Sequence, residues 1–142
     1  MSKDLRPDRD SFFTPLLASQ PYANLPDCTS SSQTTQRLNQ WLIACTETHP
    51  ECQTFWETAL PKRVLEIQDA YVYLREDTVE KGRYACLSHC WGAQGPSLKL
   101  ERSTYQQLTS GVTVDQLPKT FGDAVSICIS IGIRFLWIDA LC

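Results

Sequence analysis

The sequence predicts an α/β protein whose central unit is a strand, a helix and a second strand in a partial parallel sheet, preceded by a helix and a β-hairpin. The first observation is the apolar run 84–87, which changes abruptly into small and polar residues at 88–92, as a buried strand does where it enters a loop. The second is the run 135–138, which is apolar throughout and is followed by Asp139. Such a run is typical of a parallel strand covered on both faces. The third observation is an apolar helical face between the two runs, formed by Phe121, Ala124, Val125 and Cys128.

Length and charge exclude several function classes. A chain of 142 residues is the size of one domain, and its 42% hydrophobic content is ordinary for a globular protein. The net charge of -3 comes from 13 basic and 16 acidic residues that are scattered along the chain, so neither nucleic acid nor an anionic membrane is an expected partner. The charged first six residues do not resemble a secretory signal, and every apolar run is too short to cross a bilayer. A cytosolic or nuclear protein is therefore expected, and cytoplasmic is the favoured location.

The chain contains seven cysteines, which in a secreted protein would indicate a disulfide framework. In a reducing compartment most of them are instead expected to be small buried hydrophobic residues. Cys86 and Cys128 fit this interpretation because each lies inside an apolar run.

The first part of the chain divides into a leader and a helical segment. Residues 1–33 contain four prolines and little periodicity, which predicts a flexible leader. The region 34–80 begins with a helix whose apolar face is formed by Leu38, Trp41, Leu42 and Cys45. Thr34 or Thr35 is expected to cap this helix. It is expected to end by Thr48 or His49, because the residue before Pro50 avoids the helical region.

The rest of 34–80 and the region 81–142 contain the remaining elements. Strands at 64–67 and 71–74 are expected to form an antiparallel hairpin across 68–70. In 81–142, a short helix at 103–108 is expected to end at Gly111. The main helix follows. The spacing of Thr120 and Asp123 predicts a capping box at its start, and Gly132 suits the position just past its end. The connection between the two strands is expected to be right-handed.

A candidate ligand crevice lies at the carboxyl ends of the two predicted strands, where α/β proteins usually bind ligands. Its residues are Ser88, His89, Trp91, Gly92 and Asp139. If the strands are parallel neighbours, the hydroxyl, imidazole and carboxylate groups are expected to converge there. The alternative is structural: Ser88 and Asp139 cap nearby helices while Trp91 packs the loop down.

Catalytic interpretations of the same residues are less favoured. Ser88 and His89 are neighbours on opposite sides of the backbone, and no nucleophile elbow surrounds the serine, which argues against a hydrolase triad. A cysteine protease built on Cys90 or Cys142 with His49 or His89 is weaker again, because the residues imply no geometry. The glycines at 92–96 lack the lysine and the spacing of a phosphate loop.

A metal-binding interpretation concerns Cys45, His49 and Cys52, which are spaced at i, i+4 and i+7, with Cys28 as a conceivable fourth ligand. Zinc accepts such a ligand set. Against it, paired Cys-x-x-Cys spacing is absent, and Pro50 is expected to turn Cys52 off the helical face. Buried core cysteines are therefore the favoured interpretation, and no cofactor is expected.

Three stretches resemble, in order, the motifs of the fungal heterokaryon incompatibility (HET) domain. They are YACLSHCWG at 84–92, LPKTFGDA at 117–124 and GIRFLWIDALC at 132–142. His89 stands where the family more often has tyrosine. The upstream Trp41, the Cys45, His49 and Cys52 set, and residues 60–65 also resemble the region that commonly precedes this domain, so the likeness covers roughly residues 38–142.

This resemblance implies a fungal intracellular protein of non-self recognition, whose activation triggers programmed cell death. The partner it implies is a second copy or another incompatibility or receptor protein. HET domains are distantly similar to TIR domains, signalling modules with a flavodoxin-like parallel sheet, some of which cleave NAD with a glutamate on a later helix. The HET pattern continues past the motif that ends in Cys142, so this chain is expected to be a C-terminally truncated fragment, and no catalytic residue is carried over.

Three functions thus remain open. The leading one is a signalling and interaction module, so this chain is not expected to be an enzyme. The second is a TIR-like enzyme that cleaves NAD when full length. The third is a zinc-stabilised structural module built on Cys45, His49 and Cys52.

Overall fold

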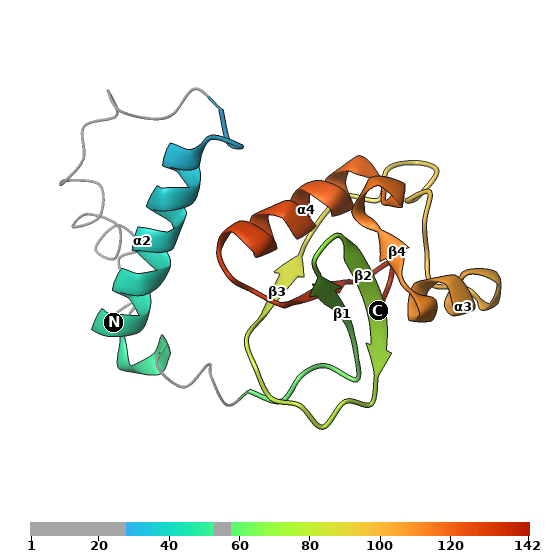
Figure 1. The fold of residues 1–142 in the computed structure, drawn as a ribbon, viewed down its shortest axis with the longest axis horizontal. Coiled ribbons are helices and arrows are strands. Elements are labelled where there is room, and N and C mark those ends of the chain that lie inside the picture. Colours follow the sequence, from blue (N-terminus) through green and yellow to red (C-terminus); the bar gives the residue numbers. More distant parts are fainter. Residues whose placement is uncertain (1–27, 53–57) are drawn as a thin grey trace, which may run out of the picture.

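The computed structural model describes residues 28–52 and 58–142, so most of the expected leader lies outside the described residues (Figure 1). The described part contains three α-helices, short 3₁₀ segments at 50–52 and 114–116, and a five-stranded sheet, which confirms the α/β class. In chain order the elements are α2 (Ser32–Thr48), β1 (Arg63–Gln68), β2 (Tyr71–Glu76), β3 (Tyr84–Leu87), α3 (Arg102–Ser110), β4 (Val112–Thr113), η4 (Val114–Gln116), α4 (Lys119–Ser130) and β5 (Phe135–Ile138).

The sheet has the strand order β3-β5-β1-β2-β4. β3 and β5 are parallel neighbours, with Tyr84 opposite Phe135 and Leu87 opposite Ile138. This confirms the predicted strand-helix-strand unit. The predicted hairpin also forms, but it extends the same sheet, because β1 pairs antiparallel with both β2 and β5. The result is a mixed sheet with its parallel pair at one end.

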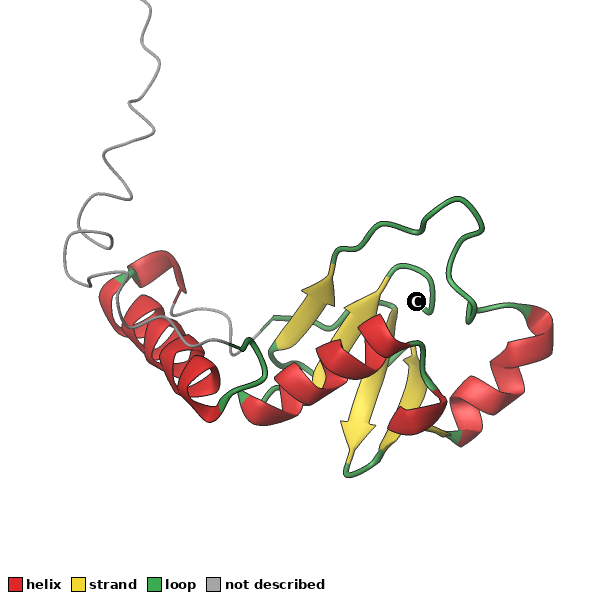
Figure 2. Ribbon diagram, turned by 90° about the horizontal axis from the view of Figure 1, so that it is seen from above, coloured by secondary structure: helices red, strands yellow, loops and turns green. Residues whose placement is uncertain are grey.

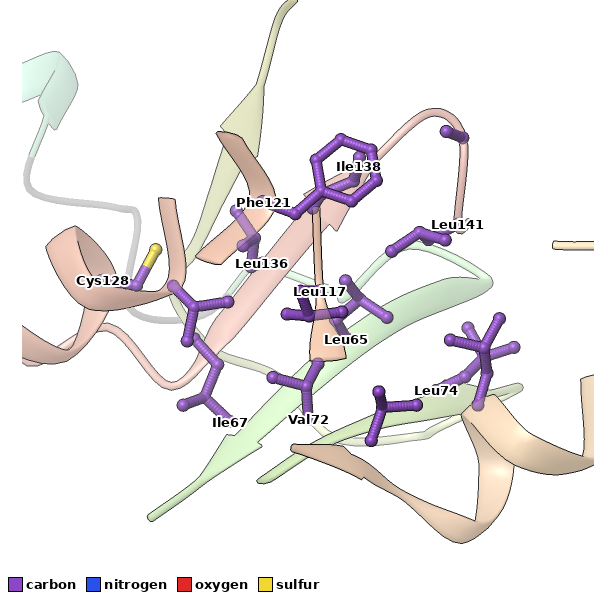
Figure 3. Packing of buried hydrophobic residues seen from close by; sticks show 14 of the residues in the cluster. Leu65, Ile67, Val72, Leu74, Leu117, Phe121, Cys128, Leu136, Ile138 and Leu141 are labelled. Atoms are coloured by element: carbon purple, nitrogen blue, oxygen red, sulfur yellow. The ribbon is translucent and has the colours of Figure 1, made fainter. Parts of the chain in front are cut away.

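The helix α4 packs across one face of this sheet, whereas α3 lies at its side (Figure 2). Leu108 of α3 belongs to the same buried cluster as the apolar face of α4. On α4, Phe121, Val125 and Cys128 are buried, as the periodicity predicts. They contact a cluster that includes Leu65 of β1 and Leu136 of β5 (Figure 3). Burying a side chain of this size contributes about 1.5–3 kcal/mol, so this cluster is the main source of stability.

The strand β1 is buried at all four of its central positions. Its sequence does not alternate between apolar and polar residues as clearly as that of a half-buried strand does. Leu65 and Ile67 join the main core, whereas Val64 packs with Leu60 and Phe135 on the other face. The buried Glu66 also belongs to the strand. Its carboxylate accepts hydrogen bonds from Arg75 and Arg134, which offset the cost of burying a charge.

The strand β3 differs from its prediction as a buried strand. It lies at the edge of the sheet, and its four residues are half-buried or exposed. The prediction that Cys86 is a buried hydrophobic residue is also wrong, because this side chain is exposed. An edge strand has a neighbour on one side only, and a short apolar run does not reveal how many neighbours a strand has.

The ends of α4 follow the prediction in part. Gly132 has φ +69° just past the helix, and the amide of Ile133 donates to the carbonyl of Cys128, as in a Schellman motif. The predicted capping box is absent. The helix begins at Lys119 after Pro118, so Thr120 already lies inside the first turn. Asp123 instead pairs with Lys119 at 2.6 Å.

The helix α2 lies beside α4 and has no buried residue (Figures 1 and 2). It ends at Thr48, as predicted, but its cap is Ser31, whose hydroxyl accepts a hydrogen bond from the amide of Thr34. The Asn39 side chain donates to the carbonyl of Ser130 at the end of α4. In the described part of the chain, no helix is both long and apolar enough to cross a membrane.

Candidate functional site

The candidate site lies where β3 and β5 end. Because these strands are parallel neighbours, their carboxyl ends meet at one edge of the sheet (Figure 2). Residues 88–92 therefore emerge close to Asp139. The adjacency on which the predicted crevice depends is therefore present. The loop after Gly92 returns to the same edge, where the amide of Leu100 donates to the carbonyl of Ala140 at 2.8 Å.

The closest polar contact in the site joins Trp91 to Asp139. The indole Nε1 donates to the carboxylate Oδ2 at 2.9 Å. The Lys99 ammonium lies over the Trp91 ring, 5.6 Å from its centroid, and places a positive charge near the aromatic face. Gly92, the next residue, has φ +69°, a conformation that glycine adopts without strain and that lets the loop turn after Trp91. Both Trp91 and Asp139 remain partly exposed.

The side chain of His89 lies beneath this pair and is only 11% exposed. Its ring packs edge-on against Phe121 of α4, with 5.1 Å between the ring centroids. Its Nδ1 is 3.6 Å from the Asp139 carboxylate, just beyond hydrogen-bond length, and neither ring nitrogen has a partner among the described residues. A buried polar group without a partner costs about 1–3 kcal/mol, so a small movement toward Asp139 is favourable.

The five predicted crevice residues therefore divide into two sets. His89, Trp91 and Asp139 converge, and Gly92 shapes the loop that carries them. Ser88 is exposed, and the described polar contacts of Asp139 come from His89 and Trp91 instead. The sequence predicts Phe121 only as a core residue and not as a neighbour of His89. It does not predict that Lys99 lies over Trp91, because no local pattern marks this lysine.

Cys142, one of the two cysteines suggested as nucleophiles, is not in a reactive form. Burial raises the pKa of the Cys142 thiol to about 11, and it does the same for Cys128. A catalytic cysteine needs a lowered pKa, because the thiolate is the nucleophile. Cys90 is exposed on the loop.

The comparisons with known proteins bear on this part of the chain. The family model described as "Heterokaryon incompatibility protein (HET)" matches residues 84–142. Over these residues the chain is similar to the HET family. The function of the segment is accordingly of the heterokaryon incompatibility type. No curated protein and no solved structure matches the chain, so the distant likeness to TIR domains stays a prediction.

The HET segment starts at β3 and contains all three motif stretches. The first supplies His89 and Trp91, the second supplies Phe121, and the third supplies Asp139. These four residues form a chain of contacts: Phe121 packs against His89, His89 lies next to Asp139, and Asp139 accepts a hydrogen bond from Trp91. We call them the HET centre.

A second cluster lies outside the HET segment, at the end of α2. The potential ligand atoms of Cys45, His49 and Cys52 all lie within 4.8 Å of one another. Pro50 does place Cys52 outside the helix, but it does not separate Cys52 from the other two residues, because residues 50–52 form a 3₁₀ turn that brings the Cys52 sulfur to 3.3 Å from that of Cys45. The hydrogen bond with Cys45 raises the pKa of the Cys52 thiol, since a proton shared between two sulfurs is held more tightly.

Two further expectations about these cysteines also change. Cys45 and Cys52 are half-buried, and α2 buries no residue, so the interpretation as core cysteines is wrong for both. Cys28 precedes the start of α2, whereas Cys45 lies in its last turns. A helix of 17 residues is about 25 Å long, so Cys28 lies too far away to be the fourth ligand.

Proposed function

We propose that this chain acts as a signalling module of fungal non-self recognition, in which association with a second copy starts a reaction that ends in cell death. The observation that carries the proposal is the convergence of the three HET motifs in one centre. The elements β3, α4 and β5 bring together residues as far apart in the sequence as His89 and Asp139. This is expected if the motifs act as one unit.

The HET centre has the properties of a contact surface. Trp91 is 43% exposed and the Asp139 side chain is 42% exposed, so both are accessible to a partner. The indole N–H is held by the carboxylate, which fixes the ring in one orientation. A fixed, partly exposed tryptophan loses little conformational entropy on binding, and such residues are enriched at the centres of interfaces.

The edge strand β3 offers the route to self-association. Its partner is β5 on one side only, and Tyr84, Ala85, Cys86 and Leu87 carry no charge. Edge strands are usually protected by lysine, proline or a covering element. A hollow of about 390 Å³ lies between Leu42 of α2 and the side chains of Tyr84 and Cys86, so α2 does not seal this edge. Two copies can therefore pair through β3 in an antiparallel manner about a two-fold axis.

Light scattering on the purified chain tests the association. We expect a dimer that becomes a monomer in Cys86→Lys, because a charge at the centre of β3 opposes pairing of two copies. Cys86→Ser is the matched control and is expected to remain a dimer, which excludes an intermolecular disulfide as the cause. A wild-type chain that stays monomeric at high micromolar concentration would remove self-association from the proposal.

Inducible expression in a filamentous fungus tests the outcome in cells. We expect growth arrest and dye uptake with the wild-type chain, and loss of both with Asp139→Ala at equal protein level. Asp123→Ala is the control, because it removes a carboxylate from the second motif but breaks only an exposed ion pair with Lys119, worth about 0–1 kcal/mol. Equal killing by the wild type and Asp139→Ala would contradict a role for the HET centre.

A further inference from the structure

We propose that Cys45, His49 and Cys52 bind one zinc ion at the end of α2, with the fourth coordination position open to water. This site lies outside the HET segment, and neither the motif match nor the proposed function assigns it a role. Two thiols and one imidazole form a ligand set that suits zinc, and three protein ligands with one open position are a known zinc arrangement.

The local backbone brings the three ligands together. Cys45 and His49 lie one turn apart, and the amide of His49 donates to the carbonyl of Cys45 at 3.1 Å. Residues 50–52 then form a 3₁₀ turn, in which the amide of Cys52 donates to the carbonyl of His49 at 2.9 Å. Pro50 starts this turn and limits the conformations available to it. The backbone thus holds the ligands near one point before any ion arrives.

The distances suit tetrahedral coordination. With Zn–S of about 2.3 Å and Zn–N of about 2.0–2.1 Å, the ligand atoms of a tetrahedral site are roughly 3.3–3.8 Å apart. The two sulfurs are 3.3 Å apart, and all three ligand atoms lie within 4.8 Å of one another. Small side-chain rotations therefore complete the site, and binding releases the two thiol protons to solvent.

The surroundings give the ion a structural role. The helix α2 has no fully buried residue, so among the described residues apolar packing stabilises it less than it stabilises α4. An ion that joins Cys45 in the helix to Cys52 beyond its end would fix the last turn of α2 and the 3₁₀ turn at 50–52. His49 is exposed and Cys45 and Cys52 are half-buried, so the site is open to metal from solvent.

Zinc binding by the full chain tests the proposal. The reduced, metal-stripped protein is titrated with Zn²⁺ against a chromogenic chelator, and with Co²⁺ as a spectroscopic probe of thiolate ligands. We expect one ion per chain, tetrahedral thiolate bands with Co²⁺, and slower amide exchange at 45–52 on binding. We expect Cys45→Ser, Cys52→Ser and His49→Gln each to weaken binding at least about tenfold.

Cys86→Ser is the matched control, since it removes an exposed thiol elsewhere and is expected to bind zinc as the wild type does. Circular dichroism of each variant checks that the fold is retained. Binding that is equally weak in the wild type and in the Cys45→Ser, Cys52→Ser double variant would overturn the proposal. A Cys45–Cys52 disulfide that persists in reductant and leaves no zinc uptake would also overturn it.

Discussion

The pKa of a charged side chain in this protein depends on its burial and on its hydrogen-bond partners. Glu66 is the clearest case, because it is 3% exposed in the middle of the sheet. Burial alone raises the pKa of its carboxyl group, but hydrogen bonds from Gln68, Arg134 and Arg75 outweigh burial and lower the pKa to about 2 from 4.5. The arginines are themselves half exposed, so their charges stay hydrated while they neutralise the carboxylate.

The lowered pKa of Glu66 predicts how stability depends on pH. Since the folded protein binds this proton less readily than the unfolded chain, the contribution of Glu66 is complete above pH 4.5 and is lost as the pH falls toward 2. Its size is about 3 kcal/mol. Glu66→Gln is expected to lower the free energy of unfolding at pH 7 by roughly this amount and to flatten its acid dependence, as measured by urea titration at several pH values.

Glu76→Gln is the comparison for this prediction. Glu76 lies on the neighbouring strand β2 and pairs with Arg63 at 2.6 Å, but both side chains are partly exposed. Removing its charge is expected to lower the free energy of unfolding much less than removing that of Glu66, because solvent screens an exposed ion pair. Equal losses for Glu66→Gln and Glu76→Gln would show that burial does not strengthen the Glu66 cluster.

At the scale of helices and strands, the sequence predicts those features that depend on residues close together in the chain. The apolar face of α4 and the end of α3 at Gly111 follow from spacing and from glycine, and both are confirmed. The predicted start of α4 is wrong because two local signals compete, and Pro118 takes the N-cap position in place of Thr120. The proximity of Cys52 to Cys45 does not follow from the sequence, because a proline usually ends a helix, whereas Pro50 begins a 3₁₀ turn.

Replacing the glycine that follows α4 and the glycine that follows α3 by alanine is expected to lower the free energy of unfolding by different amounts. Gly132 has φ +69°, and a Cβ added there would meet only open space, so Gly132→Ala costs only backbone strain, about 1 kcal/mol. Gly111 has φ +106°, and an added Cβ would lie 2.5 Å from the Tyr73 ring. Gly111→Ala is therefore expected to cost about 3 kcal/mol, since strain and overpacking add. Thermal unfolding of both variants measures the difference, and a smaller loss for Gly111→Ala would contradict the close packing of α3 on β2.

At the scale of the whole molecule, the arrangement depends on pairings that local patterns do not encode. The sequence predicts the parallel pair β3 and β5, because a helix connects them and parallel strands need such a connection. It does not reveal that β1 pairs with β5 and joins the hairpin to the same sheet. It likewise predicts that Asp139 lies near the 88–92 loop, but not that Trp91 is its hydrogen-bond partner.

The central claim is that the three HET motifs meet in one centre, and the indole N–H resonance of Trp91 tests it most directly. The chain has four tryptophans, so a ¹⁵N-correlated spectrum gives four indole signals, and Trp91→Phe identifies one of them. Asp139→Ala removes the acceptor 2.9 Å from that nitrogen. We expect this variant to shift the Trp91 signal strongly and to leave the other three in place. A Trp91 signal that does not move would contradict the HET centre.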